Sequence, residues 1–268
     1  MNFFDLSGKV AVVIGATGIL GGAIARGLAG HGAKVAVLGR SEDRGRQRVQ
    51  EIEEAGGRGV FLSVDVTDPN ALQGAHKRIG QELGAVDVLV NAAGGNQDQV
   101  TVTDERKIEQ ILPEDWRSCF DLNLVGGALL PCQEFGPAMV ERRRGSIVNI
   151  ASIAAHIPLS RVVAYSSAKA ALVSLTQFLA REWATQGVRV NSITPGFFPA
   201  EQNRRLLYEE DGTQTPRAQQ ILSHTPMERF GAPEELVGVA VFLASDTASG
   251  FVTGTDIRVD GGFLSTTI

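Results

Sequence analysis

The chain of 268 residues carries 25 Lys and Arg against 30 Asp and Glu, a formal net charge of −5 at pH 7. This balance disfavours a nucleic-acid partner, because phosphates select a basic surface. No apolar run approaches the length of a membrane span, and residues 1–8 lack the charged-then-apolar order of a secretory signal. We therefore expect a cytoplasmic protein without a membrane partner. The length suits one α/β domain, and Cys119 and Cys132 form neither a redox pair nor a metal-ligand set.

The first predicted strand, residues 9–14, leads into the glycine-rich sequence Gly15-Ala-Thr-Gly18-Ile-Leu-Gly21-Gly22 and then into a helical pattern. A strand, a glycine turn and a helix form the setting that a dinucleotide fingerprint requires. The glycines let the backbone approach a pyrophosphate, and the free N–H groups at the helix start bind the anion. The cofactor contacts expected here are Gly15, Thr17, Gly18, Ile19, Leu20 and Gly21.

The second predicted strand, residues 33–38, ends at Gly39-Arg40-Ser41. An acidic residue at this end would bind the ribose 2′-hydroxyl and indicate NAD, but the chain has glycine followed by arginine. A guanidinium can stack on adenine and bind a 2′-phosphate. The alternative is a solvated arginine that opens a charged helix over residues 41–55. We favour NADP(H), keep NAD(H) as the alternative, and count Arg40 and Ser41 among the cofactor candidates.

Two further strands are predicted at residues 59–64 and 86–90, and the second runs into Asn91-Ala-Ala-Gly94. Ligands of open α/β sheets collect at the carboxyl ends of strands, so Asn96 is a candidate substrate contact. A turn-capping asparagine is an equally good interpretation of Asn96. Residues 101–112 are polar and predict an exposed excursion before a helix that begins at Pro113.

The sequence Gly145-Ser-Ile-Val-Asn-Ile-Ala-Ser152 predicts a strand that ends in the serine, and a helix over residues 164–184 follows. Tyr165 and Lys169 stand at i and i+4 and therefore share one helix face. A nearby ammonium favours phenolate over phenol, which brings the tyrosine towards the range useful for proton transfer. The hydroxyl of Ser152 would donate a hydrogen bond to the substrate oxygen with which Tyr165 exchanges a proton. The alternative is a surface tyrosine with a lysine one turn on.

Ser152, Tyr165 and Lys169 resemble the Ser-Tyr-x-x-x-Lys core of the short-chain dehydrogenase/reductase family. The resemblance covers residues 1–268 and implies a single-domain, doubly wound Rossmann fold, with a mostly parallel seven-stranded sheet and helices on both faces. It implies that Tyr165 protonates the forming alkoxide, Ser152 polarises the carbonyl, and Lys169 lowers the tyrosine pKa and holds the ribose. It also implies that Asn123 holds a water linking the lysine to solvent, and that the protein is a homo-oligomer, by family analogy a tetramer.

The same resemblance extends the expected cofactor site. It adds Asp65, Val66, Asn91, Ala92, Ala93, Gly94, Tyr165, Lys169, Pro195, Gly196 and Phe198. The glycine spacing departs from the family pattern, because most single-domain members have Gly-x-x-x-Gly-x-Gly where this chain has Gly-x-x-Gly-x-x-Gly. This difference concerns the shape of the turn.

Residues 196–230 are polar and rich in turn signals, which predicts a lid over the substrate. Their motifs, in residues 195–204, 215–216, 222–227 and 229–231, are similar to a branch of the family named for D-mannonate oxidoreductases (fructuronate reductases). We therefore expect a sugar-acid substrate, whose carboxylate needs a cation and whose hydroxyls need amide or carboxylate partners. The substrate candidates are Asn96, Ser152, Glu201, Gln202, Asn203 and Arg204, with Arg161 and Arg205 as further cations.

Three alternatives stay open at this point. Arg204 and Arg205 fit a solvated helix as well as a carboxylate site. A general carbonyl or 3-oxoacyl-thioester reductase would use the same Ser152, Tyr165 and Lys169. A non-catalytic cofactor-binding protein is the third alternative, although it would have no use for these residues.

Overall fold

A computed structural model describes residues 2–200 and 204–266, except the side chain of Arg205. Seven strands form one sheet in the order β3-β2-β1-β4-β5-β6-β7. Every neighbouring pair is parallel, so the sheet is wholly parallel where the sequence predicted mostly parallel strands. The strands are β1 (Val10–Ile14), β2 (Lys34–Gly39), β3 (Arg58–Ser63), β4 (Val88–Asn91), β5 (Gly145–Ile150), β6 (Val188–Pro195) and β7 (Asp256–Val259).

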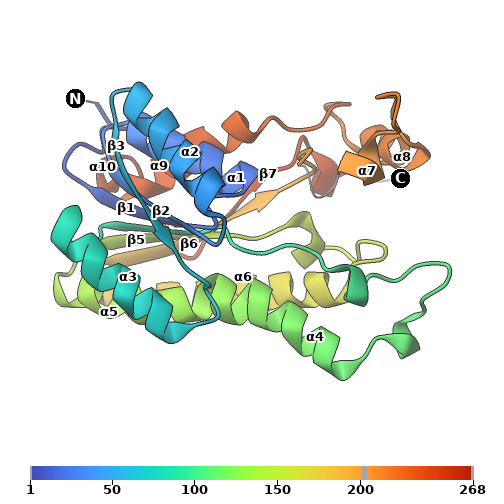
Figure 1. The fold of residues 1–268 in the computed structure, drawn as a ribbon, viewed down its shortest axis with the longest axis horizontal. Helices are drawn as coiled ribbons and strands as arrows, with labels where there is room; N and C mark the ends of the chain where they lie inside the picture. The colour runs from blue at the N-terminus through green and yellow to red at the C-terminus, as the bar shows by residue number, and fades with distance from the viewer. Residues whose placement is uncertain (1, 201–203, 267–268) are drawn as a thin grey trace.

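Helices cover both faces of the sheet, as predicted (Figure 1). One face carries α1 (Ile19–Gly30), α2 (Glu42–Glu54) and α9 (Val237–Ala244). The other carries α3 (Pro69–Glu82), α4 (Pro113–Phe120), α5 (Leu130–Glu141) and α6 (Val163–Trp183). The remaining helices are α7 (Arg204–Leu207), α8 (Pro216–His224) and α10 (Asp246–Ser249).

Each face of the sheet has its own hydrophobic core. Residues of α1 and α9 pack with alternate residues of β1, such as Ala11 and Val13, while α3 and α5 pack with Val10, Val12 and Ile14. A strand buried on both faces needs apolar side chains at every position, which explains the uninterrupted Val-Ala-Val-Val-Ile sequence of β1.

The strand order reverses beside β1, because β2 and β3 follow on one side and β4 to β7 on the other. In a doubly wound sheet such a reversal opens a crevice at the carboxyl ends of the strands. The segments that carry the predicted site, after β1, β4, β5 and β6, all leave the sheet at this end (Figure 1).

Two predicted elements differ in detail. The strand expected to reach Ser152 ends at Ile150, and Ser152 instead caps a short 3₁₀ turn, Ile153–Ala155. Between α4 and α5 the chain is π-helical over Asp121–Leu129, a deviation that often marks functional sites.

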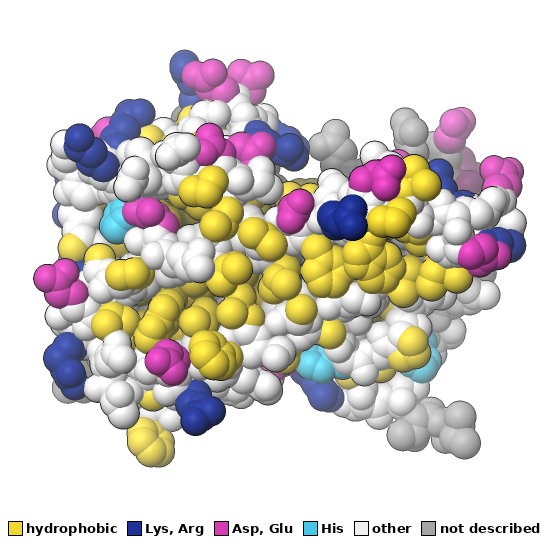
Figure 2. Space-filling view, turned by 90° about the horizontal axis from the view of Figure 1, so that it is seen from below, with side chains coloured by type: hydrophobic (Ala, Val, Ile, Leu, Met, Phe, Trp, Pro, Cys, Tyr) yellow, Lys and Arg dark blue, Asp and Glu magenta, His cyan; other side chains and the backbone are white. Residues whose placement is uncertain are grey.

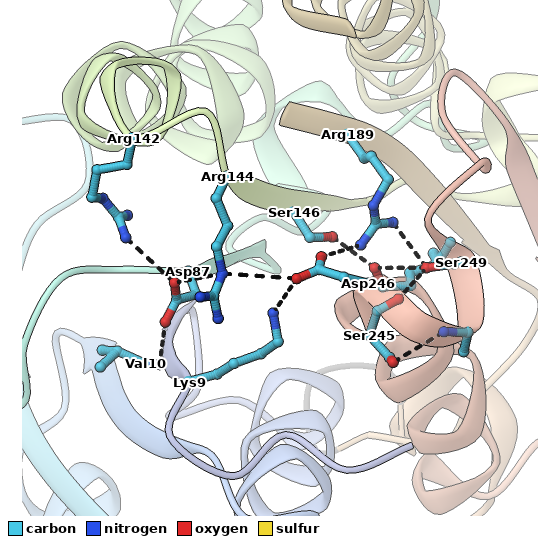
Figure 3. Close-up of polar contacts among 12 residues, drawn as sticks. Lys9, Val10, Asp87, Arg142, Arg144, Ser146, Arg189, Ser245, Asp246 and Ser249 are labelled. Atoms are coloured by element: carbon cyan, nitrogen blue, oxygen red, sulfur yellow. Dashed lines mark hydrogen bonds and ion pairs between the residues drawn. The ribbon is translucent and has the colours of Figure 1, made fainter. Parts of the chain in front are cut away.

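The opposite, amino-terminal edge of the sheet is held by a network of ion pairs (Figure 3). Asp246 of α10 pairs with Lys9 at 2.6 Å and with Arg189 of β6 at 3.2 Å. Arg144, which precedes β5, lies between Asp246 at 3.8 Å and Asp87 at 3.4 Å. Because the network joins segments far apart in the sequence, we assign it to the stability of the fold.

Within the described residues, no helix is long and apolar enough to cross a membrane. No group of three or more His, Cys, Asp or Glu side chains that could hold a metal occurs in the same part of the chain. Cys119 and Cys132 are free and buried.

Candidate active site

A cavity of about 830 Å³ lies at the carboxyl ends of the strands. It runs from the glycine-rich turn after β1 to Tyr165 and Lys169 on α6, so it joins the predicted cofactor and catalytic sites. The predicted residues that line it are Gly15, Thr17, Gly18, Ile19, Leu20, Gly21, Arg40, Asp65, Val66, Ala92, Ala93, Gly94, Asn96, Ser152, Tyr165, Lys169, Pro195, Gly196 and Phe198.

The glycine-rich turn packs so closely that side chains are excluded. Gly15 has φ +77°, and a Cβ built on it would lie 2.7 Å from the backbone nitrogen of Ala93. A Cβ on Gly21 would lie 2.5 Å from the carbonyl oxygen of Gly15. Helix α1 begins at Ile19, directly after this turn, with its first N–H groups at the cavity. This cradle fits the pyrophosphate of a dinucleotide, in spite of the unusual glycine spacing.

The end of β2 explains why residue 39 is glycine. A Cβ at Gly39 would lie 2.4 Å from Oγ1 of Thr17, so the acidic residue typical of NAD sites cannot stand there unless Thr17 moves. Arg40 lines the cavity beside Asp65. Hydrogen bonds from Thr67 lower the pKa of Asp65, and the charge of Arg40 lowers it further, so the carboxylate is held ionised.

Helix α2 adds two cations that the sequence analysis missed, Arg44 and Arg48. The Arg48 side chain is 14 % exposed and pairs with Glu51, while its Nε is buried without a hydrogen-bond partner. The three- and four-residue spacing of Arg44, Gln47 and Arg48, on a helix that begins directly after β2, could have indicated this face. The other lining residues not predicted are Gly39, Val64, Gly95, Gln97, Leu122, Ile150, Ala151, Phe197 and Ala200.

Tyr165 and Lys169 share one face of α6, as their spacing predicted. Nζ of Lys169 lies 5.7 Å from the centre of the Tyr165 ring. It donates a hydrogen bond of 2.8 Å to the carbonyl oxygen of Ile150, at the end of β5. The lysine is 4 % exposed, and burial lowers its pKa to about 8.

The acidity of Tyr165 differs from the prediction. Burial raises the pKa of Tyr165, and a hydrogen bond that Ser152 donates to the tyrosine oxygen opposes that rise only in part. The net lowering expected from Lys169 is therefore not found, because the loss of hydration on burial outweighs the hydrogen bond with Ser152. A raised pKa keeps the phenol protonated, which suits a proton donor.

Asn123 lies behind the cavity wall, fully buried in the π-helical stretch. Its side chain accepts a hydrogen bond of 2.9 Å from the backbone N–H of Gly95 and donates one of 3.0 Å to the Gly95 carbonyl. It also donates to the carbonyl of Cys119 at 2.9 Å, the group that a regular α-helix would pair with the backbone N–H of residue 123. Asn123 thus fixes the turn after β4, which carries Gly94 beside Lys169.

Two cofactor candidates do not line the cavity. Asn91 is 1 % exposed and donates a hydrogen bond of 2.8 Å to Asn149, so it joins β4 to β5 inside the sheet. Ser41 is the N-cap residue of α2 and also lies outside the lining.

The substrate candidates divide into three groups. Asn96 and Ser152 line the cavity, and Asn96 also donates a hydrogen bond of 2.6 Å to Thr101. Arg204 does not reach the cavity, because its guanidinium lies over the Tyr208 ring, 5.7 Å from the ring centre. Glu201, Gln202 and Asn203 lie outside the described residues.

Comparison with known proteins agrees with this geometry over nearly the whole chain. Residues 15–264 match the family model described as enoyl-(acyl carrier protein) reductase. The chain belongs to the short-chain dehydrogenase/reductase family. It is an NAD(P)-dependent oxidoreductase, and the doubly wound fold predicted from the sequence is confirmed by its relatives.

Three relatives are similar over almost their full length. The chain is 42 % identical to the oxidoreductase UxuB of Bacillus subtilis, of uncharacterised activity, over 97 % of this chain and 96 % of the relative. A Haemophilus influenzae structure, named provisionally as a D-mannonate oxidoreductase and containing NAD, has 34 % identity and a TM-score of 0.92, covering 98 % of this chain and 97 % of that one. A gluconate 5-dehydrogenase from Burkholderia cenocepacia, in complex with NADP and tartrate, has 30 % identity and a TM-score of 0.89, covering 99 % of both chains.

A relative of another activity is about as similar. The 3-oxoacyl-[acyl-carrier-protein] reductase of Escherichia coli is 35 % identical over 98 % of both chains. Overall similarity therefore shows the family and the type of reaction, but it does not distinguish a sugar acid from an acyl thioester as the substrate.

Proposed function

We propose that the enzyme transfers hydride between a nicotinamide cofactor and the carbonyl or alcohol carbon of a hexonate-type sugar acid, such as D-fructuronate and D-mannonate. The observation that carries the oxidoreductase reaction is the continuity of one cavity from the glycine cradle to Tyr165 and Ser152. The sugar-acid class is supported by the motifs of residues 195–231 and by the relatives named for mannonate and gluconate.

The bound cofactor would supply or accept the hydride. During reduction Tyr165 would donate its proton to the forming alkoxide, because its raised pKa keeps it protonated until the substrate oxygen becomes basic. Ser152 would donate a hydrogen bond to the same oxygen and orient the carbonyl. Lys169 would hold its charge beneath the tyrosine ring and stabilise the phenolate that remains.

We further propose that the cofactor is NADP(H). Three arginines, Arg40, Arg44 and Arg48, line the end of the cavity beside β2 and α2, where residue 39 is glycine. Titration of the protein with NADPH and NADH, followed by nicotinamide fluorescence, tests this. We expect tighter binding of NADPH, and we expect Arg40→Gln to weaken NADPH by about tenfold while leaving NADH unchanged. Tighter binding of NADH by the unmodified protein would reject this choice.

Residues 196–230 are proposed to act as a substrate lid. Their apolar residues Leu207, Ala218 and Ile221 belong to one hydrophobic cluster with Ile153, the residue next to Ser152. Closure over the substrate would therefore change the packing beside the catalytic Ser152.

We also propose that the protein is a homo-oligomer, a tetramer by analogy with the family. Figure 2 shows a broad hydrophobic area on the face that carries α4, α5 and α6. Phe178, on α6, is 58 % exposed, although it is large and apolar. Light scattering on the purified protein gives the mass directly, and a monomeric mass at micromolar concentration would refute the proposal.

The test of the proposed substrate class is a panel of hexonates, matching polyols, simple ketones and a 3-oxoacyl thioester, assayed with both cofactors. We expect catalytic efficiency to be greatest for a hexonate. Equal or better turnover of the uncharged compounds would leave a general carbonyl reductase, and preference for the thioester would indicate the activity of the Escherichia coli relative. Absence of turnover together with tight cofactor binding would support a non-catalytic protein.

A further inference from the structure

Two arginines on segments far apart in the sequence lie near each other, outside the lining of the cavity. Arg217 belongs to the first turn of α8, and its guanidinium lies 3.5 Å from the hydroxyl of Ser160, the neighbour of Arg161. Arg161 is close enough for its charge to act on Arg217. Neither side chain forms an ion pair with an acidic residue within the range 2–200 and 204–266.

The position of Arg217 is electrostatically unfavourable for a cation. Partial burial lowers the pKa of Arg217, and the charge of Arg161 lowers it further. The first turn of a helix adds the partial positive charge of its unpaired N–H groups. The two guanidinium charges and the start of α8 therefore lie in one region, and an anion bound between them would be stabilised by all three.

Arg161 adds a strained backbone to this arrangement. Its φ is +74°, a conformation that residues other than glycine rarely adopt. The carbonyl of Arg161 accepts a hydrogen bond of 2.8 Å from Val102, which holds the residue in place. Backbone strain of this kind is concentrated at ligand-binding sites.

The pair lies where the three segments around the substrate side of the cavity meet. Arg161 stands in the loop between Ser152 and Tyr165, and its partner Val102 follows Asn96, which lines the cavity. Figure 1 shows this loop, the segment after β4 and α8 at the same end of the sheet. Four peptide units separate Arg161 from Tyr165, which limits the distance between their Cα atoms to about 14 Å.

We propose that Arg161 and Arg217 bind the carboxylate of the sugar-acid substrate, while its reacting carbon lies at Ser152 and Tyr165. The proposal rests on the proposed function and specifies which residues of the site select an acid. None of the three arginines lines the cavity, but the guanidinium of Arg204 packs on the Tyr208 ring, whereas Arg217 contacts the loop between Ser152 and Tyr165. The carboxylate is therefore assigned to Arg161 and Arg217. Two guanidinium groups provide the planar, multiple N–H donors that a carboxylate accepts best.

The test uses the full-length variants Arg161→Gln and Arg217→Gln, with Arg181→Gln as the matched control. Arg181 is an exposed arginine near the other end of α6. Each protein is assayed with D-mannonate and D-gluconate and with the corresponding polyols, and hexonate binding to the enzyme–cofactor complex is measured by calorimetry. We expect each test variant to lose about 10- to 100-fold in hexonate affinity and kcat/KM, mainly through KM. Activity on the polyols, and all properties of the control, should stay within about twofold of the unmodified protein.

A second variant separates binding from folding. Arg161→Gly removes the guanidinium and also relieves the left-handed strain, so it should unfold at a higher urea concentration and still lose hexonate binding. If the unmodified protein binds and turns over hexonates and the arginine variants do so equally well, this inference is wrong and the proposed function stands. If the unmodified protein neither binds nor turns over any hexonate, both fall together.

Discussion

Gly94 lines the cavity and lies against both Asn123 and Lys169. The substitution Gly94→Ala therefore tests whether these two side chains depend on the absence of a side chain at position 94. Gly94 has φ +142°. A Cβ there would lie 2.6 Å from Oδ1 of Asn123 and 3.4 Å from Nζ of Lys169. The added methyl group must therefore displace a side chain that is fully buried and hydrogen-bonded on both sides of its amide.

The size of the effect follows from two contributions. A non-glycine residue at this φ costs on the order of 1–3 kcal/mol. Displacement of Asn123 weakens its hydrogen bonds to Gly95, and each buried group left unpaired costs about 1–3 kcal/mol. We expect Gly94→Ala to lower the free energy of unfolding by about 3 kcal/mol and to reduce turnover, because Lys169 and the turn after β4 shift together.

Urea denaturation with an unchanged m-value measures this loss directly. The matched control is Gly74→Ala on α3, where an added Cβ would meet nothing within 4 Å. The same chemical change should stabilise that exposed helix position by about 0.5–1 kcal/mol. A Gly94→Ala protein as stable and as active as the unmodified one would refute the coupling of Gly94 to Asn123 and Lys169.

Three further predictions concern the tyrosine, the lysine and the ion-pair network. Tyr165→Phe should reduce turnover by about 10²–10⁴ while cofactor affinity, measured by fluorescence titration, stays the same, because only the proton donor is removed. Burial lowers the pKa of Lys169 to about 8, so the unfolded chain binds more protons than the folded one above that pH. The stability of the unmodified protein relative to Lys169→Met should therefore rise between pH 8 and about 10, by at most about 1.4 kcal/mol per pH unit in urea titrations. Asp246→Asn should destabilise the fold by about 2 kcal/mol, because Lys9 and Arg189 lose their charged partner. The loss is smaller than for a fully buried ion pair because the Asp246 side chain is half-exposed. Burial alone would raise the pKa of Asp246, but its hydrogen bonds and ion pairs with Lys9 and Arg189 outweigh burial and lower it. The stabilisation is then present above the unfolded pKa of about 3.9, and it is lost as the pH falls through the lower folded value.

Each of these has a result that would contradict it. A phenylalanine variant that keeps more than about a tenth of the activity would remove Tyr165 from the role of proton donor. A stability difference between the unmodified protein and Lys169→Met that is flat from pH 8 to 10 would show that the folded lysine titrates like a free one. Equal urea midpoints for the unmodified protein and Asp246→Asn at pH 7 would show that the network in Figure 3 is not a source of stability.

The sequence by itself determined the sheet, the cradle and the catalytic spacing. These are local or periodic features: β1 is apolar at every position because both of its faces are buried, and a φ of +77° at position 15 favours glycine strongly. Tyr165 and Lys169 lie on one helix face because the helical period places i and i+4 together. Such features need no knowledge of distant segments, so they can be predicted from the order of residues alone.

What only the tertiary structure decided depends on which distant segments meet. Asn91 is the last residue of β4 and Asn96 follows the same strand, but Asn91 is hydrogen-bonded to Asn149 inside the sheet while Asn96 lies at the cavity. The pKa of Tyr165 rises where the neighbouring lysine predicted a fall, because hydration lost on folding cannot be judged from spacing. Arg161 and Arg217 stand 56 residues apart and acquire a shared role only because α8 folds back on the loop before α6. Burial and long-range contacts, which do not depend on local sequence, set these last properties.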